Sequence, residues 1–173
     1  IMDKELSKYN NLLELFIKQY QSEKKDEIFL QSLKNVNLRF TWKQTFDSIQ
    51  KLSNYLMKYI SPEDRCLLIS ENRPEWLITD LSIMLAKGIT VPAYITYTEK
   101  DYEYLINDCK PSVIIISDII QFKKIENLIH KYDFIKKVIS FENIKLDKIT
   151  SLNKIFNETK YLEQDLENLN LKR

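Results

Sequence analysis

Apolar residues recur at helical spacing near the start of the chain, and shorter apolar runs follow. Leu12, Phe16 and Tyr20 share one face of a helix predicted over 12–20. The runs EIFLQSL and NLRFTW then stand on either side of the polar stretch KNVN. Because two β-prone runs flank a polar turn, this stretch predicts a short β-hairpin.

A second helix is predicted directly after the hairpin. Thr41 suits the N-cap position, and Gln44 stands three residues later, as a capping box requires. The apolar stripe of this helix continues as far as Ile60, and Pro62 marks its end.

From residue 65 onward, apolar runs of strand length alternate with helical patterns. Thr98 and Asp101 have the spacing of another helix start. The run SVIIIS is apolar without alternation, as in a strand that is covered on both faces. The predicted strands are 65–70, 89–94, 112–117 and 136–141, and the predicted helices are 74–87, 98–109 and 119–132.

Strands separated by helices of these lengths imply right-handed βαβ units and a mostly parallel sheet. We therefore predict an α/β fold with a sheet of about four to five strands and helices on both faces, preceded by a helix and a short β-hairpin. The apolar positions are sparser from residue 142 onward. We expect an α/β part over 1–141 and a helical or irregular tail over 142–173, with short helices around 151–157 and 159–169.

Composition narrows the functional classes. Hydrophobic residues make up 44% and charged residues 29% of the 173, and the formal net charge is +1. This balance creates no field that would favour nucleic acid as a partner. No apolar run approaches the ~18 residues of a membrane span, and the N-terminus lacks the apolar segment of a signal peptide. We expect a cytoplasmic chain, for which peripheral contact with a membrane stays open.

The scarcity of glycine excludes the common phosphate loops. Gly88 is the one glycine in the chain, where average usage would give about twelve. Neither G-x-G-x-x-G nor G-x-x-x-x-G-K-[ST] can therefore occur, and such loops need glycine because the backbone approaches the phosphate closely. Cys66 and Cys109 fall in apolar patterns and are interpreted as buried reduced thiols. The single histidine, His130, stands near lysines and is interpreted as a solvated side chain.

The turn SENRPEW joins a predicted strand to a predicted helix, which is where many α/β proteins bind phosphate. Pro74 removes one of the free N–H groups of the helix start. Asn72 can cap this helix, with Glu75 completing a reciprocal box. The alternative is a cap one residue later, because Pro74 disfavours helical geometry at Arg73. We favour an ion pair with a carboxylate over a phosphate contact for Arg73, core packing for Trp76, and a capped corner for the whole turn.

The same region carries a family resemblance. The stretch EDRCLLISENRPEWLITDLSIMLAKGITVPAYITYTEKDYEYLINDCKPSVIIIS resembles the N-terminal region of AMP-forming long-chain acyl-CoA synthetases, which belong to the adenylate-forming superfamily. The earlier stretch LRFTWKQTFDSIQKLSNYL is similar to the helix start that follows the first hairpin in that family, so the likeness runs from about Leu12 to Ser117. Glu63 is a departure, because the family often has glycine before Asp-Arg. Pro62 and Asp64 can still build this turn.

The resemblance implies an enzyme in which a carboxylate attacks the α-phosphate of ATP, giving an acyl-adenylate and pyrophosphate. The thiol of CoA then displaces AMP. ATP, Mg²⁺ and CoA are thus implied for the full-length enzyme, with a fatty acid as the other substrate. The family's Ser/Thr/Gly-rich phosphate loop, its aromatic-Gly-x-Thr-Glu motif, its ribose-binding Asp and its C-terminal lysine have no counterpart in the 173 residues. We therefore assign no catalytic, cofactor-binding or metal-binding residue to this segment and expect it to bind none of these cofactors.

Two hypotheses of different class follow. In the first, the chain is the N-terminal part of a long-chain fatty acid–CoA ligase, as its start with Ile before Met2 also suggests. Residues 1–141 would then lead the AMP-binding N-terminal domain and 142–173 would lead toward the phosphate loop. The partner would be the rest of the same enzyme, its ATP-binding half and C-terminal domain, and this part alone would be inactive. In the second, the chain is a non-catalytic α/β interaction module. An adenylation enzyme for another carboxylic acid differs from the first hypothesis only in substrate.

Overall fold

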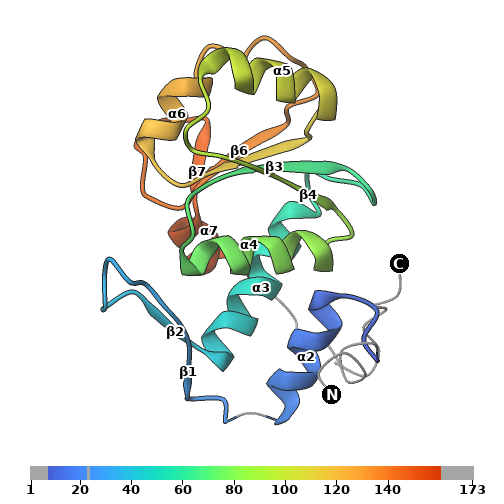
Figure 1. The fold of residues 1–173 in the computed structure, drawn as a ribbon, viewed down its shortest axis with the longest axis vertical. Coiled ribbons are helices and arrows are strands. Elements are labelled where there is room, and N and C mark those ends of the chain that lie inside the picture. Colours follow the sequence, from blue (N-terminus) through green and yellow to red (C-terminus); the bar gives the residue numbers. More distant parts are fainter. Residues whose placement is uncertain (1–7, 23, 161–173) are drawn as a thin grey trace.

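The computed structural model describes residues 8–22 and 24–160. Five strands form one parallel sheet in the order β4-β3-β5-β6-β7. The predicted α/β fold with a mostly parallel sheet is therefore confirmed (Figure 1). The strands are β3 (Arg65–Ile69), β4 (Ile89–Ala93), β5 (Val113–Ile116), β6 (Lys137–Ser140) and β7 (Ile149–Ser151).

Both faces of the sheet are covered, which explains the unbroken apolar runs of its central strands. Cys66 and Leu68 of β3 face one hydrophobic cluster, whereas Leu67 and Ile69 face another. All four side chains are fully buried. A strand with helices on both faces needs no polar side, so its sequence shows no alternation.

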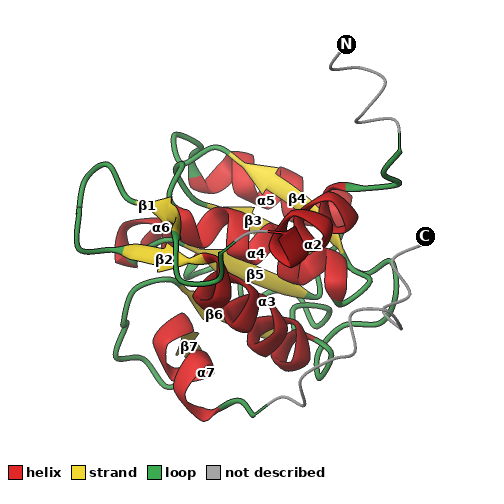
Figure 2. Ribbon diagram, turned by 90° about the horizontal axis from the view of Figure 1, so that it is seen from below, coloured by secondary structure: helices red, strands yellow, loops and turns green. Residues whose placement is uncertain are grey.

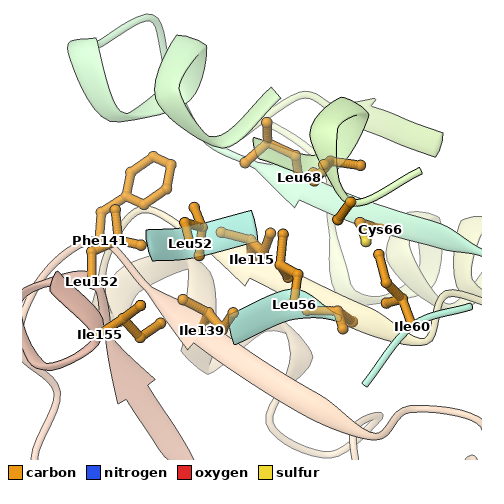
Figure 3. Close-up of a cluster of buried hydrophobic side chains, with 13 residues drawn as sticks. Leu52, Leu56, Ile60, Cys66, Leu68, Ile115, Ile139, Phe141, Leu152 and Ile155 are labelled. Atoms are coloured by element: carbon orange, nitrogen blue, oxygen red, sulfur yellow. The ribbon is translucent and has the colours of Figure 1, made fainter. Parts of the chain in front are cut away.

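Helices α3 (Trp42–Leu56), α4 (Pro74–Leu85) and α7 (Leu152–Glu158) supply side chains to the first face, and α5 (Glu99–Cys109) and α6 (Ile119–Ile125) to the second. Figure 1 shows these two groups on opposite sides of the strands. Figure 3 shows the first face, where Leu52 and Leu56 of α3 lie beside Ile139 of β6 and Ile155 of α7. The sheet and its helices thus share one continuous interior.

The N-terminal helix and hairpin pack beneath α3 and α4. Helix α2 (Leu12–Ser22) precedes the antiparallel strands β1 (Ile28–Gln31) and β2 (Arg39–Thr41), as predicted. Figures 1 and 2 show the hairpin beside α3, away from the parallel sheet. Phe16 of α2 stacks with Trp42 at 5.7 Å, and Trp42 stacks with Phe29 of β1 at 3.9 Å between ring centroids. These aromatic contacts hold the three segments together.

Two helix starts agree with the sequence prediction in atomic detail. Gln44 donates its backbone N–H to Thr41 Oγ1 at 3.1 Å, and Thr41 N donates to Gln44 Oε1 at 3.0 Å. Thr98 and Asp101 make the same reciprocal pair at the start of α5. Capping boxes are local, so the sequence alone was enough to find them.

Strand β7 was not predicted. It pairs in parallel with the open side of β6, with Val138 opposite Ile149. Three residues are too short to show a period, and the pairing comes from the free edge of β6 and the burial of Ile149. The predicted helix around 151–157 is confirmed as α7, and the helix proposed around 159–169 lies almost wholly outside the described residues.

Helix α6 is shorter than the predicted 119–132 and ends at Ile125. Beyond it, the N–H groups of Leu128 and Lys131 bond to carbonyls three residues back, so the chain continues as tight turns. Lys131 pairs with Glu103 on α5, and these turns are therefore held against that helix. In the part of the chain that the structure describes, no helix combines the length and hydrophobicity needed to span a bilayer.

Candidate functional site at the carboxyl edge of the sheet

The strand order creates one place where α/β proteins commonly bind ligands. The chain leaves β3 for β4 on one side and later returns to β5 on the other side. In open parallel sheets, ligands bind outside the carboxyl ends of the strands at such a reversal. The residues that follow β3 and β5 here are Ser70–Arg73 and Ser117–Asp118, so this edge is the candidate site.

Arg73 is the central charge of this edge. Its Nε and Nη2 donate to the two carboxylate oxygens of Glu75 at 2.9 and 2.8 Å. Its Nη1 lies 3.4 Å from Glu142 and 3.6 Å from Glu71. The guanidinium also stands over the Phe141 ring, 5.5 Å from its centroid. One cation therefore faces three carboxylates, and the predicted ion pair of Arg73 is present.

Partial burial of Arg73 would by itself lower its pKa. The hydrogen bond and charge of Glu75, followed by the hydrogen bond to Glu142 and the charge of Glu71, outweigh this effect and raise the pKa of Arg73. The guanidinium stays charged, but its donors are directed at carboxylates of the same chain. An incoming phosphate would have to displace these carboxylates and would meet their repulsion.

The start of α4 differs from the predicted capping box. Arg73 is the N-cap residue, with an extended backbone (φ −156°, ψ 162°) and no capping bond from its side chain. Asn72 as the cap was therefore wrong, and the alternative one residue later is confirmed. The reason is Pro74, which forces the preceding residue out of helical geometry, while Glu75 binds Arg73 instead of closing a box.

Other polar groups of this edge are also used locally. Asp118 accepts from the backbone N–H of Gln121 at 3.0 Å and so caps α6. Ser70 donates to the carbonyl of Glu71 at 2.7 Å. The hydroxyl of Ser117 is buried without a hydrogen-bond partner among the described residues. Residues 8–22 and 24–160 contain no group of three or more His, Cys, Asp or Glu placed to hold a metal ion.

Two apolar side chains are exposed at the carboxyl edge of the sheet, after β4 and β5. Tyr94, directly after β4, is 73% exposed, and Ile120 in the first turn of α6 is 64% exposed. Tyr102 brings the two segments together, because its hydroxyl donates to the Tyr94 carbonyl at 2.7 Å and lies 3.3 Å from Gln121 Oε1. Exposed apolar side chains in one place mark a surface that another part of a protein can cover. The sequence did not reveal this surface, because Tyr94 falls at the end of a predicted strand (89–94) and Ile120 within a predicted helix (119–132).

Of the other residues singled out from the sequence, Trp76 lies at this edge, where its backbone N–H donates to the Arg73 carbonyl at 2.9 Å. Cys66 and Cys109 are buried free thiols, and burial raises their pKa to about 12 and about 11. Trp76 packs against the cluster of Figure 3. His130 is exposed, as expected, but its Nδ1 lies 3.4 Å from Lys148 Nζ, a neighbour that the sequence did not reveal. The structure therefore leaves the two thiols and His130 outside the candidate site and gives Trp76 a packing role beside it.

Comparisons with known proteins agree with this architecture. The family described as AMP-binding enzyme matches residues 17–167. The chain is 26% identical over 136 residues to the long-chain-fatty-acid–CoA ligase ACSBG2 of Mus musculus, which covers 77% of this chain and 20% of that protein. It is 28% identical over 81 residues to 4-hydroxybutyrate–CoA ligase 2 of Metallosphaera sedula, which covers 46% of this chain and 15% of that protein. The chain thus spans about a fifth or less of the length of these relatives.

Solved structures show the same fold at low identity. The anthranilate CoA ligase AuaEII, in complex with anthranoyl-AMP, matches 87% of this chain and 28% of its own at a TM-score of 0.74 and 17% identity. A red-emitting luciferase from Phrixothrix hirtus matches 92% of this chain and 30% of its own at a TM-score of 0.71 and 19% identity. At such identities the likeness establishes the fold and no more.

Proposed function

Because the chain belongs to the AMP-binding enzyme family, we propose that it is the leading part of the large N-terminal domain of a long-chain fatty acid–CoA ligase. The reaction of the whole enzyme would be ATP-dependent conversion of a fatty acid and CoA to acyl-CoA, AMP and pyrophosphate. The task of this part would be structural: it supplies a sheet and helices against which the ATP-binding half folds. Its partners would be that half and the C-terminal domain.

The observation that carries this proposal is the charge balance at the carboxyl edge. Arg73 is bonded to Glu75 in bidentate fashion and lies near two further carboxylates. Such a cluster stabilises the corner between β3 and α4, but it offers no free cation to ATP. We therefore assign the binding of ATP and Mg²⁺ to residues outside this segment, and we propose no catalytic residue within it.

The exposed apolar surface supports the same proposal. Tyr94 and Ile120 are exposed after β4 and β5, and exposed apolar side chains suit a surface that another part of the same protein covers. Fatty acid as the substrate class rests on relatives such as the mouse ligase ACSBG2 and long chain acyl-CoA synthetase 4 of Arabidopsis thaliana. A smaller carboxylic acid is the second candidate, because the 4-hydroxybutyrate and anthranilate ligases are also similar.

The experiment compares this chain with a protein extended through the downstream coding sequence. Pyrophosphate release is measured with ATP, CoA and, in turn, palmitate, 4-hydroxybutyrate or anthranilate. We expect the extended protein to work best with palmitate and the folded 173-residue chain to stay at background. Adding the separately expressed remainder to this chain is then expected to restore activity.

Each contrary result removes a different part of the proposal. Fatty-acid-dependent pyrophosphate release by the 173-residue chain alone would overturn its structural role. A preference of the extended protein for anthranilate or 4-hydroxybutyrate would replace the substrate class. Failure of the extended protein with every acid would favour the non-catalytic interaction module.

A further inference from the structure

A cavity lies at the amino edge of the sheet, opposite the candidate site, where β6 and β7 begin. Its volume is about 330 Å³, and it is built by the turns after α6, the segment that enters β6 and the residue before β7. It is separated from the candidate site by the length of the strands, because Lys137 is the first residue of β6 and Glu142 follows that strand. The lining residues are Ile129, His130, Ile135, Lys136, Lys137, Val138 and Lys148.

The lining is cationic and carries no carboxylate. In the described part of the chain, Lys136, Lys137 and Lys148 form no ion pair with an acidic side chain. Lysines just outside the cavity behave differently, since Lys123 and Lys131 are both paired with glutamates. The Nζ of Lys137 lies 5.8 Å from the centroid of the Tyr59 ring, just after α3. Lys136 and Lys148 are therefore the unpaired ammonium groups of this lining, and they repel one another and attract an anion.

The position of Lys148 strengthens this attraction. Its Nζ lies 3.4 Å from His130 Nδ1. An ammonium has only donors, so Nδ1 must accept and the imidazole proton must be on Nε2. Nε2–H and the remaining N–H groups of Lys148 are then available as donors. Val138 is only 4% exposed and gives the cavity an apolar floor.

A neighbouring cavity differs from this one because its lining holds acidic side chains as well as lysines. It has a volume of about 670 Å³, lies between α3 and α7 and shares Lys137 with the smaller cavity. Its lysines are accompanied by Asp147 and Glu158. Its charges, including that of the shared Lys137, can therefore balance within the chain, whereas the lining of the smaller cavity holds no acidic side chain to balance Lys136 and Lys148.

We propose that the cavity between His130, Lys136 and Lys148 binds a phosphate-bearing anion, at a site separate from the carboxyl edge. A terminal phosphate offers three acceptor oxygens to the ammonium and imidazole donors. Two sources share this chemistry: a small soluble phosphate compound and the headgroup of an anionic phospholipid. The proposal does not depend on the catalytic role of the whole enzyme, because binding can be measured without turnover.

The test is titration calorimetry of the purified protein with inorganic pyrophosphate, at low and at high salt. We expect saturable binding that weakens with salt and that becomes at least about tenfold weaker in the double variant K136Q/K148Q. The control K43Q/K100Q removes the same net charge from exposed positions elsewhere and should bind as the parent does. His130→Ala changes an exposed side chain, so it serves if the double variant fails to fold.

The second arm identifies the source of the phosphate. Sedimentation with phosphatidylcholine vesicles, with and without phosphatidic acid, is compared for the parent and both double variants. Capture by the acidic vesicles that K136Q/K148Q loses and K43Q/K100Q keeps assigns a lipid headgroup, and pyrophosphate binding without such capture assigns a soluble compound. Absence of binding in both arms, or equal weakening in the control, overturns the proposal.

Discussion

Arg73 at the carboxyl edge of the sheet is surrounded by three carboxylates, whereas Lys136 and Lys148 at the amino edge form no ion pair among the described residues, in a cavity whose lining holds no acidic side chain. Both groups lie where strands meet loops, yet their chemistry differs. At the carboxyl edge the charges satisfy one another and hold loops together. At the amino edge the charges remain available to a ligand. The presence of basic side chains at a strand end is therefore a poor guide to binding unless their acidic neighbours are known.

The largest expected difference between the edges comes from removing one cation at each. Arg73→Ala leaves Glu75 buried and without its bidentate partner, and Glu75 is only 6% exposed. We expect the free energy of unfolding to fall by about 3 kcal/mol. Lys148→Gln breaks no ion pair and should change it by less than about 0.5 kcal/mol. Urea unfolding of both variants measures the contrast.

The double variant R73A/E75Q tests whether the unpaired carboxylate of Glu75 causes the loss of stability in Arg73→Ala. If the loss arises from an unpaired carboxylate, neutralising Glu75 should recover part of it. Equal losses in Arg73→Ala and Lys148→Gln would show that the two edges do not differ in the way described.

A smaller effect concerns the buried thiol of Cys66, near the start of β3. Cys66 in β3 is fully buried, and burial raises the pKa of its thiol to about 12 from an ordinary value of 9.0. The unfolded chain therefore loses this proton first, so the stabilising contribution is complete below pH 9 and is lost as the pH rises toward 12. We expect the parent to lose about 1 kcal/mol more than Cys66→Ala between pH 9 and pH 10.

Chemical unfolding at several pH values measures this difference in slope. Because the parent and Cys66→Ala share every other titrating group, the lysines cancel in the comparison. Parallel slopes for the two proteins would mean that water reaches Cys66 in the folded state.

The smallest expected effect on stability concerns Glu63, in the turn before β3 at the amino edge. Glu63 has φ 70°, in the left-handed region that glycine adopts without a steric cost. Glu63→Gly should therefore raise the unfolding free energy by about 0.5 kcal/mol, after allowance for the greater entropy of glycine in the unfolded chain. Asp108→Gly, within α5, is the matched control and should lower it by about 0.5–1 kcal/mol. Destabilisation by both changes would contradict strain at Glu63.

Glu63 also shows what the resemblance and the structure add to each other. Glycine is frequent at this position in the family that the sequence resembles, and the turn was expected to form from Pro62 and Asp64. Asp64 does accept from the backbone N–H of Ser61 at 2.9 Å. The turn nevertheless keeps its left-handed residue, so the missing glycine is replaced with strain and not with another turn type.

The buried strands and the helix caps could be predicted from the sequence, but the candidate site could be predicted only in part. The apolar runs of β3 and β5 and the capping residues Thr41 and Thr98 each report a local environment. The ion pair of Arg73 was expected as a class of contact, while its partner Glu142 was not identified. That partner lies 69 residues away, and no periodicity links the two positions.

The sequence by itself determined the alternation of strands and helices, the cap boxes and the family, because these depend on residues close together along the chain or on their order. Tertiary structure alone decided that β7 joins β6, that Glu142 reaches Arg73 and that His130 lies beside Lys148. These contacts join segments that become neighbours only when the sheet has assembled. Its strand order and register set which side chains meet at each edge, and a local pattern of residues carries no record of that order.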